Sequence, residues 1–364
     1  MSKTSPEYVG FGMLTPVEIM VLDQLPKHNT GAIVTEVNDF VFDDAAIIAC
    51  LLRQWDVSSA MIGTAVGDDD RGHALAKKLK EWGVQGQVRF TKEYRTPIEV
   101  NVSDRKGART YFWHRTPQML NTLDTADLKP IRGAKILYAD WYDGEHVIRA
   151  MDEANRLDVP VFFNFEHGHK NKDLLKKYAG RVSVCQAVTD AAQLGKTQAM
   201  LSTANKILKS GIKTALVTMA KDGCLVAEGK SAIRVYAPKV KAVDACGAGA
   251  TLSAGFIYGY LKGWGLEEAT RFGVAAASLK VTRAGLQMFP VEEIKALASR
   301  LDVVHLAFKE NQLERIGKVL LSRRTKILRD GQHLANLAKD KLLPKKKSTD
   351  KKRVSNQAKS KPIL

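Results

Sequence analysis

The sequence predicts an α/β fold in which helices flank a central, mostly parallel β-sheet and a small second sheet forms a lid. Two patterns carry this prediction. Across residues 1–300, apolar strand-like segments alternate with helix-like segments, as in folds built from consecutive βα units. Residues 30–37 and 96–113 instead alternate polar and apolar side chains without an intervening helix, which is typical of a small antiparallel sheet.

Individual elements follow from the same patterns. Six apolar runs predict strands of the main sheet, at residues 8–12, 60–63, 136–139, 159–163, 215–218 and 233–236. Six longer segments predict helices, at residues 44–55, 71–82, 145–156, 202–210, 250–261 and 266–281. We therefore expect one α/β domain over residues 1–300, with lid segments at about residues 8–40 and 95–115.

The composition restricts the class of protein. With 364 residues, 45% of them hydrophobic, the chain is long enough to bury a substantial core. The four cysteines lack Cys-x-x-Cys spacing, so we expect neither a zinc site nor a disulfide framework, and we expect a reducing, cytoplasmic location. The apolar run at residues 45–52 is too short to span a bilayer, so no membrane partner is expected.

The charge is concentrated at the C-terminal end. The chain has a net charge of +17, and residues 309–364 contain 17 Lys and Arg against 5 Asp and Glu. Residues 301–343 have an apolar and a basic side and predict a basic helical extension. Residues 344–364 have few apolar residues, so we expect a disordered, Lys-rich tail.

A run of small residues carries the strongest functional signal. Val243-Asp244-Ala245-Cys246-Gly247-Ala248-Gly249-Ala250 leads directly into the apolar helix at residues 251–261. Glycines let the backbone approach an anion, and the free N–H groups of the first helical turn point at it. Gly247, Ala248 and Gly249 therefore predict an anion hole for a phosphate group.

This run, together with a second one, resembles the signatures of the PfkB (ribokinase-like) carbohydrate kinases. The first is similar to Asp-Thr-x-Gly-Ala-Gly-Asp of that family. The second, Gly63-Thr64-Ala65-Val66-Gly67-Asp68-Asp69-Asp70-Arg71-Gly72, is similar to its Gly-x-Val-Gly-Asp-Asp-x-x-Gly segment. The resemblance extends over roughly residues 8–298. It implies a ribokinase-like fold and ATP-dependent phosphoryl transfer to a sugar or a related alcohol.

The position of the catalytic base departs from the family pattern. In the family, the last Asp of the signature takes the proton from the sugar hydroxyl, and this chain has Ala250 there. Loss of a positioned base typically lowers the rate by a factor on the order of 10²–10⁴. Two readings follow: phosphotransfer is impaired or lost while a nucleotide or another phosphorylated ligand still binds, or the chain is an active kinase. An active kinase would use another carboxylate, or would carry Ala250 as an engineered change from Asp.

The nucleotide side of the resemblance is mixed. Residues 218–223 resemble Thr-x-Gly-x-x-Gly, with Ala220 in place of the first glycine. The resemblance implies ATP or ADP with Mg²⁺, allows a monovalent cation, and assigns nucleotide contacts to Thr218, Ala220, Gly223, Asp244, Ala276 and Gly285. The family's Asn-x-x-Glu, which organises the magnesium-bound phosphates, falls near residues 185–190. Gln186 and Asp190 are partial substitutes there, at a different spacing.

The sugar side also departs from the family. Phe42, Asp43 and Asp44 stand where the family has a Gly-Gly pair and the residues that follow it, and Glu18 is the carboxylate nearest the family's early sugar-binding Asp. Asp140 ends a predicted central strand, the position where open α/β sheets bind ligands. The substrate candidates are Glu18, Asp43, Asp44, Asn101 and Asp140. Phe112-Trp113-His114-Arg115 ends the lid ribbon and could face a ligand or pack in a homodimer contact through the lid.

The basic tail suggests a third hypothesis, that of a scaffold or nucleic-acid-associated protein. Residues 341–361 could neutralise phosphates of a nucleic acid or another polyanion, although the segment has no aromatic residue to stack on bases.

Deletion of residues 345–364 tests this hypothesis. We expect the melting temperature to stay nearly unchanged, because the segment has too little apolar surface to offset the entropy of ordering. Retention on heparin or nucleic acid should weaken and depend less on salt, because counterion release scales with the number of phosphate contacts. Earlier unfolding with unaltered salt-dependent retention would contradict the prediction and mark the segment as a docked structural element.

Overall fold

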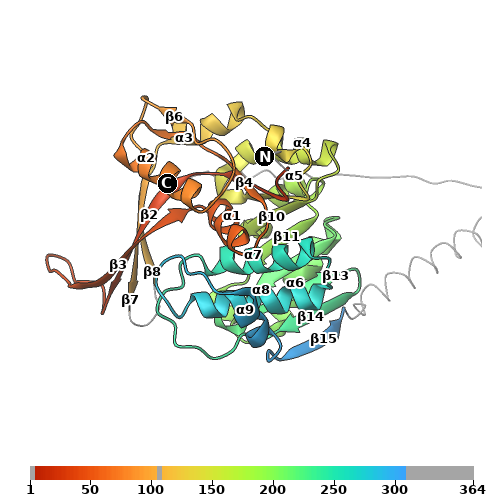
Figure 1. Ribbon diagram of the computed structural model, residues 1–364. Helices are drawn as coiled ribbons and strands as arrows, with labels where there is room; N and C mark the ends of the chain where they lie inside the picture. The colour runs from red at the N-terminus through yellow and green to blue at the C-terminus, as the bar shows by residue number, and fades with distance from the viewer. Residues whose placement is uncertain (1–4, 105–108, 309–364) are drawn as a thin grey trace, which may run out of the picture. The chain divides into compact units, whose positions relative to one another are not determined.

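The computed structural model describes residues 5–104 and 109–308, and it has the predicted α/β fold (Figure 1). Within these residues the main sheet has nine strands, in the order β15-β14-β13-β12-β11-β10-β9-β1-β4. Their bounds are β1 Tyr8–Gly12, β4 Ser59–Gly63, β9 Ile136–Asp140, β10 Val161–Glu166, β11 Val184–Val188, β12 Thr214–Thr218, β13 Cys224–Glu228, β14 Ser231–Val235 and β15 Val303–Ala307.

The sheet is parallel from β4 to β12 and antiparallel from β12 to β15. Tyr8 of β1 is in register with Ser59 on one side and Ile136 on the other. Parallel strands place their carboxyl ends at one edge, so β1, β9 and β10 bring their last residues together. This edge positions part of the candidate site described below.

Helices cover both faces of the sheet. Their bounds are α1 Asp44–Gln54, α2 Asp70–Glu81, α3 Pro117–Asn121, α4 Ile148–Arg156, α5 Lys172–Ala179, α6 Thr197–Lys209, α7 Ala248–Leu261, α8 Leu266–Lys280 and α9 Val291–Ala298. Alternate residues of β9 and β10 enter two different cores, because successive side chains point to opposite faces. Tyr138 and Phe162 pack in the core under α1, α7 and α8, whereas Leu137 and Phe163 pack under α4, α5 and α6.

Glycine allows α7 and α8 to pack closely against each other. A Cβ atom on Gly255 would lie 2.6 Å from the Cα atom of Gly273, a distance that no side chain tolerates. This contact fixes the start of α7 relative to the end of α8, where the anion loop lies.

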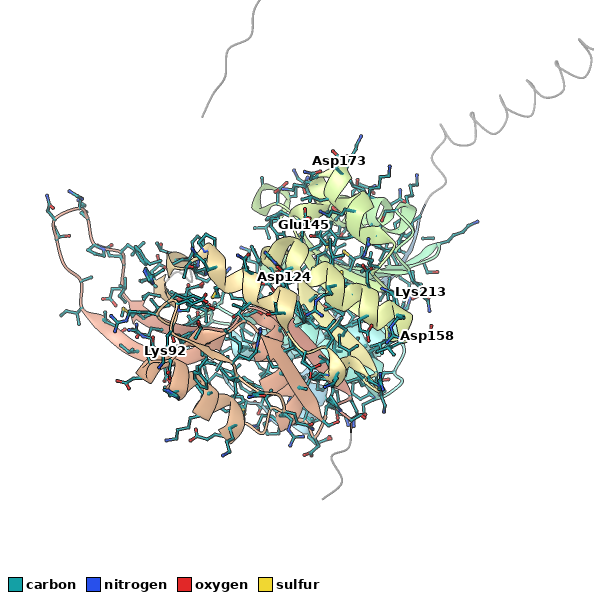
Figure 2. All side chains as sticks on the ribbon, turned by 90° about the horizontal axis from the view of Figure 1, so that it is seen from above. Lys92, Asp124, Glu145, Asp158, Asp173 and Lys213 are labelled. Atoms are coloured by element: carbon teal, nitrogen blue, oxygen red, sulfur yellow. The ribbon has the colours of Figure 1, made fainter. Side chains whose placement is uncertain are left out.

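The lid is a four-stranded sheet in the order β3-β2-β7-β8, with β2 Thr15–Leu22, β3 Val34–Phe42, β7 Ile98–Asp104 and β8 Arg109–His114. It projects to one side of the main sheet in both views (Figures 1 and 2). On β7 the side chains of Glu99, Asn101 and Ser103 are buried, which follows from the two-residue period of a strand. Two short strands, β5 Val66–Gly67 and β6 Phe90–Thr91, pair separately.

Two boundaries differ from the sequence prediction. Residues 8–12 are an inner strand of the main sheet and not part of the lid, because β1 is a fully buried apolar run paired on both sides. Residues 303–307 were expected to begin a helix, but they form β15. The β-branched Val303 and Val304 pair there with β14 at the edge of the sheet. The remainder of the predicted helix and the Lys-rich tail lie outside the described residues.

Three further features concern the cysteines, the length of the helices and the surface of the lid. All four cysteines are unpaired and buried. None of the helices in the described part of the chain is long and apolar enough to cross a membrane. The lid exposes Ile33, Val37, Phe112 and Trp113. The homodimer through the lid stays a prediction.

Candidate ligand-binding site

The anion loop, which we define as residues 244–250, turns into α7 through a left-handed glycine. Gly247 has φ 71° and ψ 5°, a conformation that favours glycine, and α7 begins at the next residue. The first backbone N–H groups of a helix have no partner within the helix. A Cβ atom on Gly249 would meet only the Gln186 Nε2 atom, at 3.9 Å, so space is open beside this turn. The local geometry therefore suits an anion.

Ala250 lies in the first turn of α7 and is fully buried. Its methyl group is part of the core formed with α1 and α8. A methyl group cannot accept a proton, so the position contributes packing and no acid–base chemistry.

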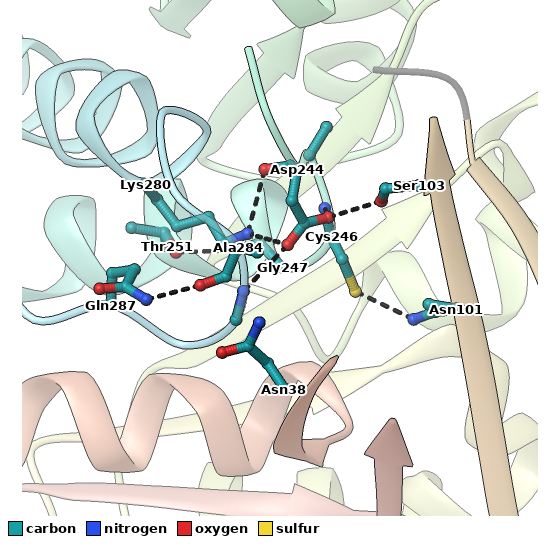
Figure 3. Close-up of polar contacts among 12 residues, drawn as sticks. Asn38, Asn101, Ser103, Asp244, Cys246, Gly247, Thr251, Lys280, Ala284 and Gln287 are labelled. Carbon is teal, nitrogen blue, oxygen red and sulfur yellow. Dashed lines mark hydrogen bonds and ion pairs between the residues drawn. The ribbon is translucent and has the colours of Figure 1, made fainter. Parts of the chain in front are cut away.

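Asp244 is the hub of the anion loop (Figure 3). Its Oδ1 atom accepts hydrogen bonds from the Ser103 hydroxyl at 3.0 Å and from the Cys246 backbone N–H at 2.9 Å. Its Oδ2 atom accepts from the Lys280 ammonium at 2.6 Å and from the Gly285 N–H at 3.3 Å. Asp244 and Lys280 are both fully buried. These contacts join the loop to the end of α8 and to the lid.

Lid side chains contact the anion loop directly. Asn101 donates to the Cys246 sulfur at 3.0 Å, and Arg109 donates to the Ala245 carbonyl at 2.9 Å. Burial raises the pKa of the Cys246 thiol to about 12, so the thiol stays neutral. The predicted substrate residue Asn101 thus contacts the anion loop from the lid side.

The predicted nucleotide residues lie on several elements. Thr218 ends β12, and Gly223 has φ 87° with room for no Cβ atom, because one would lie 2.3 Å from the Val235 carbonyl oxygen. Ala220 has φ 43°, so alanine adopts a left-handed backbone where the similar motif has glycine. Ala276 is buried in α8, and Gly285 has φ 75° beside Asn38 of β3.

Gln186 and Asp190, the predicted metal residues, have different partners. Gln186 is buried, and its Oε1 atom accepts from the Ser253 hydroxyl of α7 at 2.7 Å. Asp190 is half-exposed and forms an ion pair with Lys170. The Lys170 hydrogen bond lowers the pKa of the Asp190 carboxyl. The structure therefore brings Gln186, but not Asp190, into contact with α7.

A cluster of five carboxyl groups lies at the carboxyl ends of β1, β9 and β10. Its members, which we call the carboxylate cluster, are Asp43, Asp44, Asp140, Asp143 and Glu166. The Nδ2 group of Asn164 lies 3.0 Å from the Asp44 and Asp140 carboxylates and 3.3 Å from that of Glu166. A Cβ atom on Gly12 would lie 2.4 Å from Asp143 Oδ2 and 2.5 Å from Asp43 Oδ2. These two carboxylates therefore converge on the end of β1.

Burial raises the pKa of every carboxyl group in the carboxylate cluster, and for the four aspartates the neighbouring carboxylates raise it further. The pKa of Asp44 is raised to about 7. The positive charge of Arg109 opposes this rise at Asp44 and Glu166, and that of Arg115 opposes it at Asp43 and Asp143. Asp43 and Glu166 also have positive φ angles, of 87° and 44°. Such strain is common at functional sites.

Glu18 is set apart from the other candidates. It is in register with Val100 on the lid sheet, whereas Asn101 is in register with Ile19. Glu18 and Asn101 therefore lie on opposite faces of the lid sheet.

Sequence reasoning missed Asp143, Asn164, Glu166 and Lys280. A usable signal existed for Lys280, since a single lysine inside the apolar segment 272–281 requires a buried partner or a solvent-facing position. Asn164 and Glu166 lie at the carboxyl end of β10, where the register shifts between them and their side chains remain in contact.

Comparisons with known proteins agree with this architecture. The pfkB family carbohydrate kinase profile matches residues 44–294. An ATP-dependent 6-phosphofructokinase of Thermoanaerobacterium thermosaccharolyticum is 25% identical over 264 residues, which cover 68% of this chain and 81% of that protein. A fructokinase of Solanum tuberosum is 25% identical over 298 residues, covering 75% of this chain and 91% of that protein.

Solved structures show the same fold. Ribokinase from Thermotoga maritima superposes with a TM-score of 0.66 at 20% identity, covering 81% of this chain and 100% of that one. Ribokinase from Arabidopsis thaliana, solved in complex with ribose and ATP, superposes with a TM-score of 0.65 at 20% identity, covering 81% and 99%.

Titration of Asp44 provides a test of the carboxylate cluster. Its pKa of about 7 exceeds the ordinary value of 3.8, so the folded protein binds this proton more tightly than the unfolded chain. Stability should therefore fall as the pH rises from about 4 to above 7. We expect the melting temperature to drop between pH 5.5 and pH 8, and to drop less in Asp44→Asn. Asp190→Asn is the matched control on an exposed carboxylate and should keep the wild-type slope. A wild-type melting temperature that rises over this range would contradict the prediction.

Proposed function

The chain belongs to the pfkB family of carbohydrate kinases, and on that premise we propose that it binds a nucleotide or another phosphorylated ligand with phosphotransfer impaired or lost. The proposal rests on a contrast between neighbouring residues at the start of α7. Gly247–Gly249 have the backbone geometry and the open space for a phosphate, whereas Ala250 supplies no base. Binding and proton abstraction need different groups, so the first can persist without the second.

The ligand is proposed to bind across the two halves of the site. The phosphates would bind at the N–H groups of the first turn of α7, with Thr218, Gly223, Ala276 and Gly285 on the nucleotide side. A sugar or a related small molecule would bind toward Asp43, Asp44, Asn101 and Asp140. Arg109 supports this arrangement, because it donates to the anion loop and its charge also acts on the carboxylate cluster.

The residues present fit a nucleotide better than they fit resident metals. Within residues 5–104 and 109–308, no three His, Cys, Asp or Glu side chains are grouped to hold a metal ion. Gln186 is bonded to Ser253 and Asp190 to Lys170. We therefore propose that any Mg²⁺ enters with the phosphates of the nucleotide. The buried Asp244 carboxylate does not fit a monovalent cation either, because the Lys280 ammonium already holds it.

An active kinase is the second candidate, and a specific observation favours it. The Asp44 carboxyl has a pKa of about 7, which suits a general base at neutral pH better than an ordinary aspartate. Under this hypothesis, a member of the carboxylate cluster replaces the missing base. An ATP-consumption assay over a panel of sugars, run on the wild type and on Asp44→Asn, separates the two candidates. Turnover that Asp44→Asn abolishes favours the active kinase.

Nucleotide binding is tested by thermal unfolding. We expect millimolar ATP or ADP to raise the melting temperature, because a ligand that binds the native state alone stabilises it by mass action. Gly249→Leu should abolish the shift, since the side chain would fill the open space beside the turn. Gly180→Leu is the matched control, at a surface glycine where a Cβ atom would have nothing within 4 Å. The absence of a shift in the wild type, with and without Mg²⁺, would contradict the proposal.

Restoring the family's aspartate tests how far the site has diverged. We expect Ala250→Asp to give little or no sugar phosphorylation, because Asp43 and Asp143 also occupy the acceptor side and position 250 is buried in an apolar core. The coupled ATP-consumption assay measures this on the same sugar panel. Rescue by a large factor would show instead that Ala250 is the single defect of an otherwise ordinary kinase.

A further inference from the structure

The Lys280 ammonium has an unusual environment for a lysine. It lies at the last residue of α8 with its side chain fully buried, and it donates to two oxygens of one residue, Asp244 Oδ2 at 2.6 Å and the Asp244 carbonyl at 3.1 Å. Figure 3 shows the side chain reaching from α8 to the anion loop. The C-terminal end of a helix also favours a cation. The two Asp244 oxygens and the helix end thus favour a positive charge here and oppose the cost of burying it.

The other donors to Asp244 carry no net charge. The Ser103 hydroxyl and the Cys246 N–H bind its Oδ1 atom, and the Gly285 N–H binds Oδ2. Lys280 therefore supplies the full positive charge in this set of donors. Without it, a buried carboxylate would lie beneath the turn that is proposed to bind a phosphate, and two like charges would repel each other in a medium of low dielectric constant.

A carboxylate oxygen and a carbonyl oxygen facing one point are the ligands that a free monovalent cation such as K⁺ or NH₄⁺ would use. We propose that Lys280 is a built-in monovalent cation of the anion loop, so that phosphorylated ligands bind this chain without a free monovalent cation. The inference rests on the proposed function for its ligand-binding part. It also predicts a property of the ligand-free protein, which can be measured separately.

Backbone contacts explain how the side chain acts on the loop. The Val281 carbonyl, next to Lys280, accepts from the N–H groups of Val243 and Asp244 at 2.7 and 3.2 Å. The same short segment of chain thus holds the start of the anion loop by its backbone and neutralises it by its side chain. A free ion would supply the charge but not this fixed attachment.

The experiment removes the Lys280 ammonium and supplies a monovalent cation from solution instead. Lys280→Ala removes the charge and leaves space, and thermal unfolding is followed in KCl, NH₄Cl and N-methyl-D-glucamine chloride at equal ionic strength. The wild type should have one melting temperature and one ADP-induced shift in all three salts. Lys280→Ala should melt about 5–10 °C lower in the bulky organic salt. KCl or NH₄Cl should restore part of this loss and part of the ADP shift.

Two control variants isolate the charge from the cavity. Asp244→Asn/Lys280→Ala has the same cavity without the carboxylate, so its melting temperature should not depend on the cation. Lys295→Met removes an exposed lysine that pairs with Glu292, and it should behave as the wild type. If Lys280→Ala fails to fold in every salt, the inference is still tested by whether the melting temperatures of the wild type and of the double variant depend on the cation.

The outcomes separate the inference from the proposed function. A wild-type ADP shift that requires K⁺, or a Lys280→Ala variant whose stability ignores K⁺ and NH₄⁺, would overturn the inference. Cation dependence that persists in the double variant would also overturn it. If the wild type shows no ADP shift in any salt, the proposed function fails. Cation rescue of the ligand-free Lys280→Ala variant would then still support the built-in cation.

Discussion

The rest of the site depends on one buried ion pair, between Asp244 and Lys280. The Asp244 carboxylate binds the end of α8 through Lys280, the lid through Ser103 and its own loop through the Cys246 N–H. Removing one partner of a buried pair typically costs about 3–5 kcal/mol, because the other charge stays buried without compensation. The anion loop therefore depends for its shape on a buried interaction that joins it to the end of α8.

The two halves of the site have opposite electrostatic character. Around the anion loop Lys280 neutralises the Asp244 charge and space is open beside Gly249, whereas the carboxylate cluster collects five acidic groups. A phosphate is attracted by the first region and repelled by the ionised form of the second. The raised pKa values lessen this conflict, because a carboxyl group whose pKa is raised carries less negative charge at a given pH. Protonation thus links the acceptor side to the phosphate side.

Much of the fold could be predicted from local sequence patterns, whereas much of the candidate site depends on contacts between residues far apart in the sequence. The alternation of elements predicted the two sheets, and the run of small residues around Gly247 predicted the turn into α7. By contrast, Lys280 binds Asp244, which lies 36 residues earlier in the sequence, so no local pattern reveals the pair. Asp143, Asn164 and Glu166 join Asp43 only because parallel strands end at one edge of the sheet. β15 was missed because an edge strand is specified by its neighbour β14, and residues 303–307 alone do not reveal that pairing.

Hydrogen bonds from β7 connect the lid to the anion loop. Asn101 and Ser103 bind Cys246 and Asp244 from the lid, so a lid that swings away takes two donors from the loop. A ligand that binds more tightly when the lid is closed also favours the closed lid. By thermodynamic linkage, any contact that holds the lid closed would raise the affinity for that ligand by the same factor. Under the proposed function, the lid would be an effector of phosphate affinity as well as a cover.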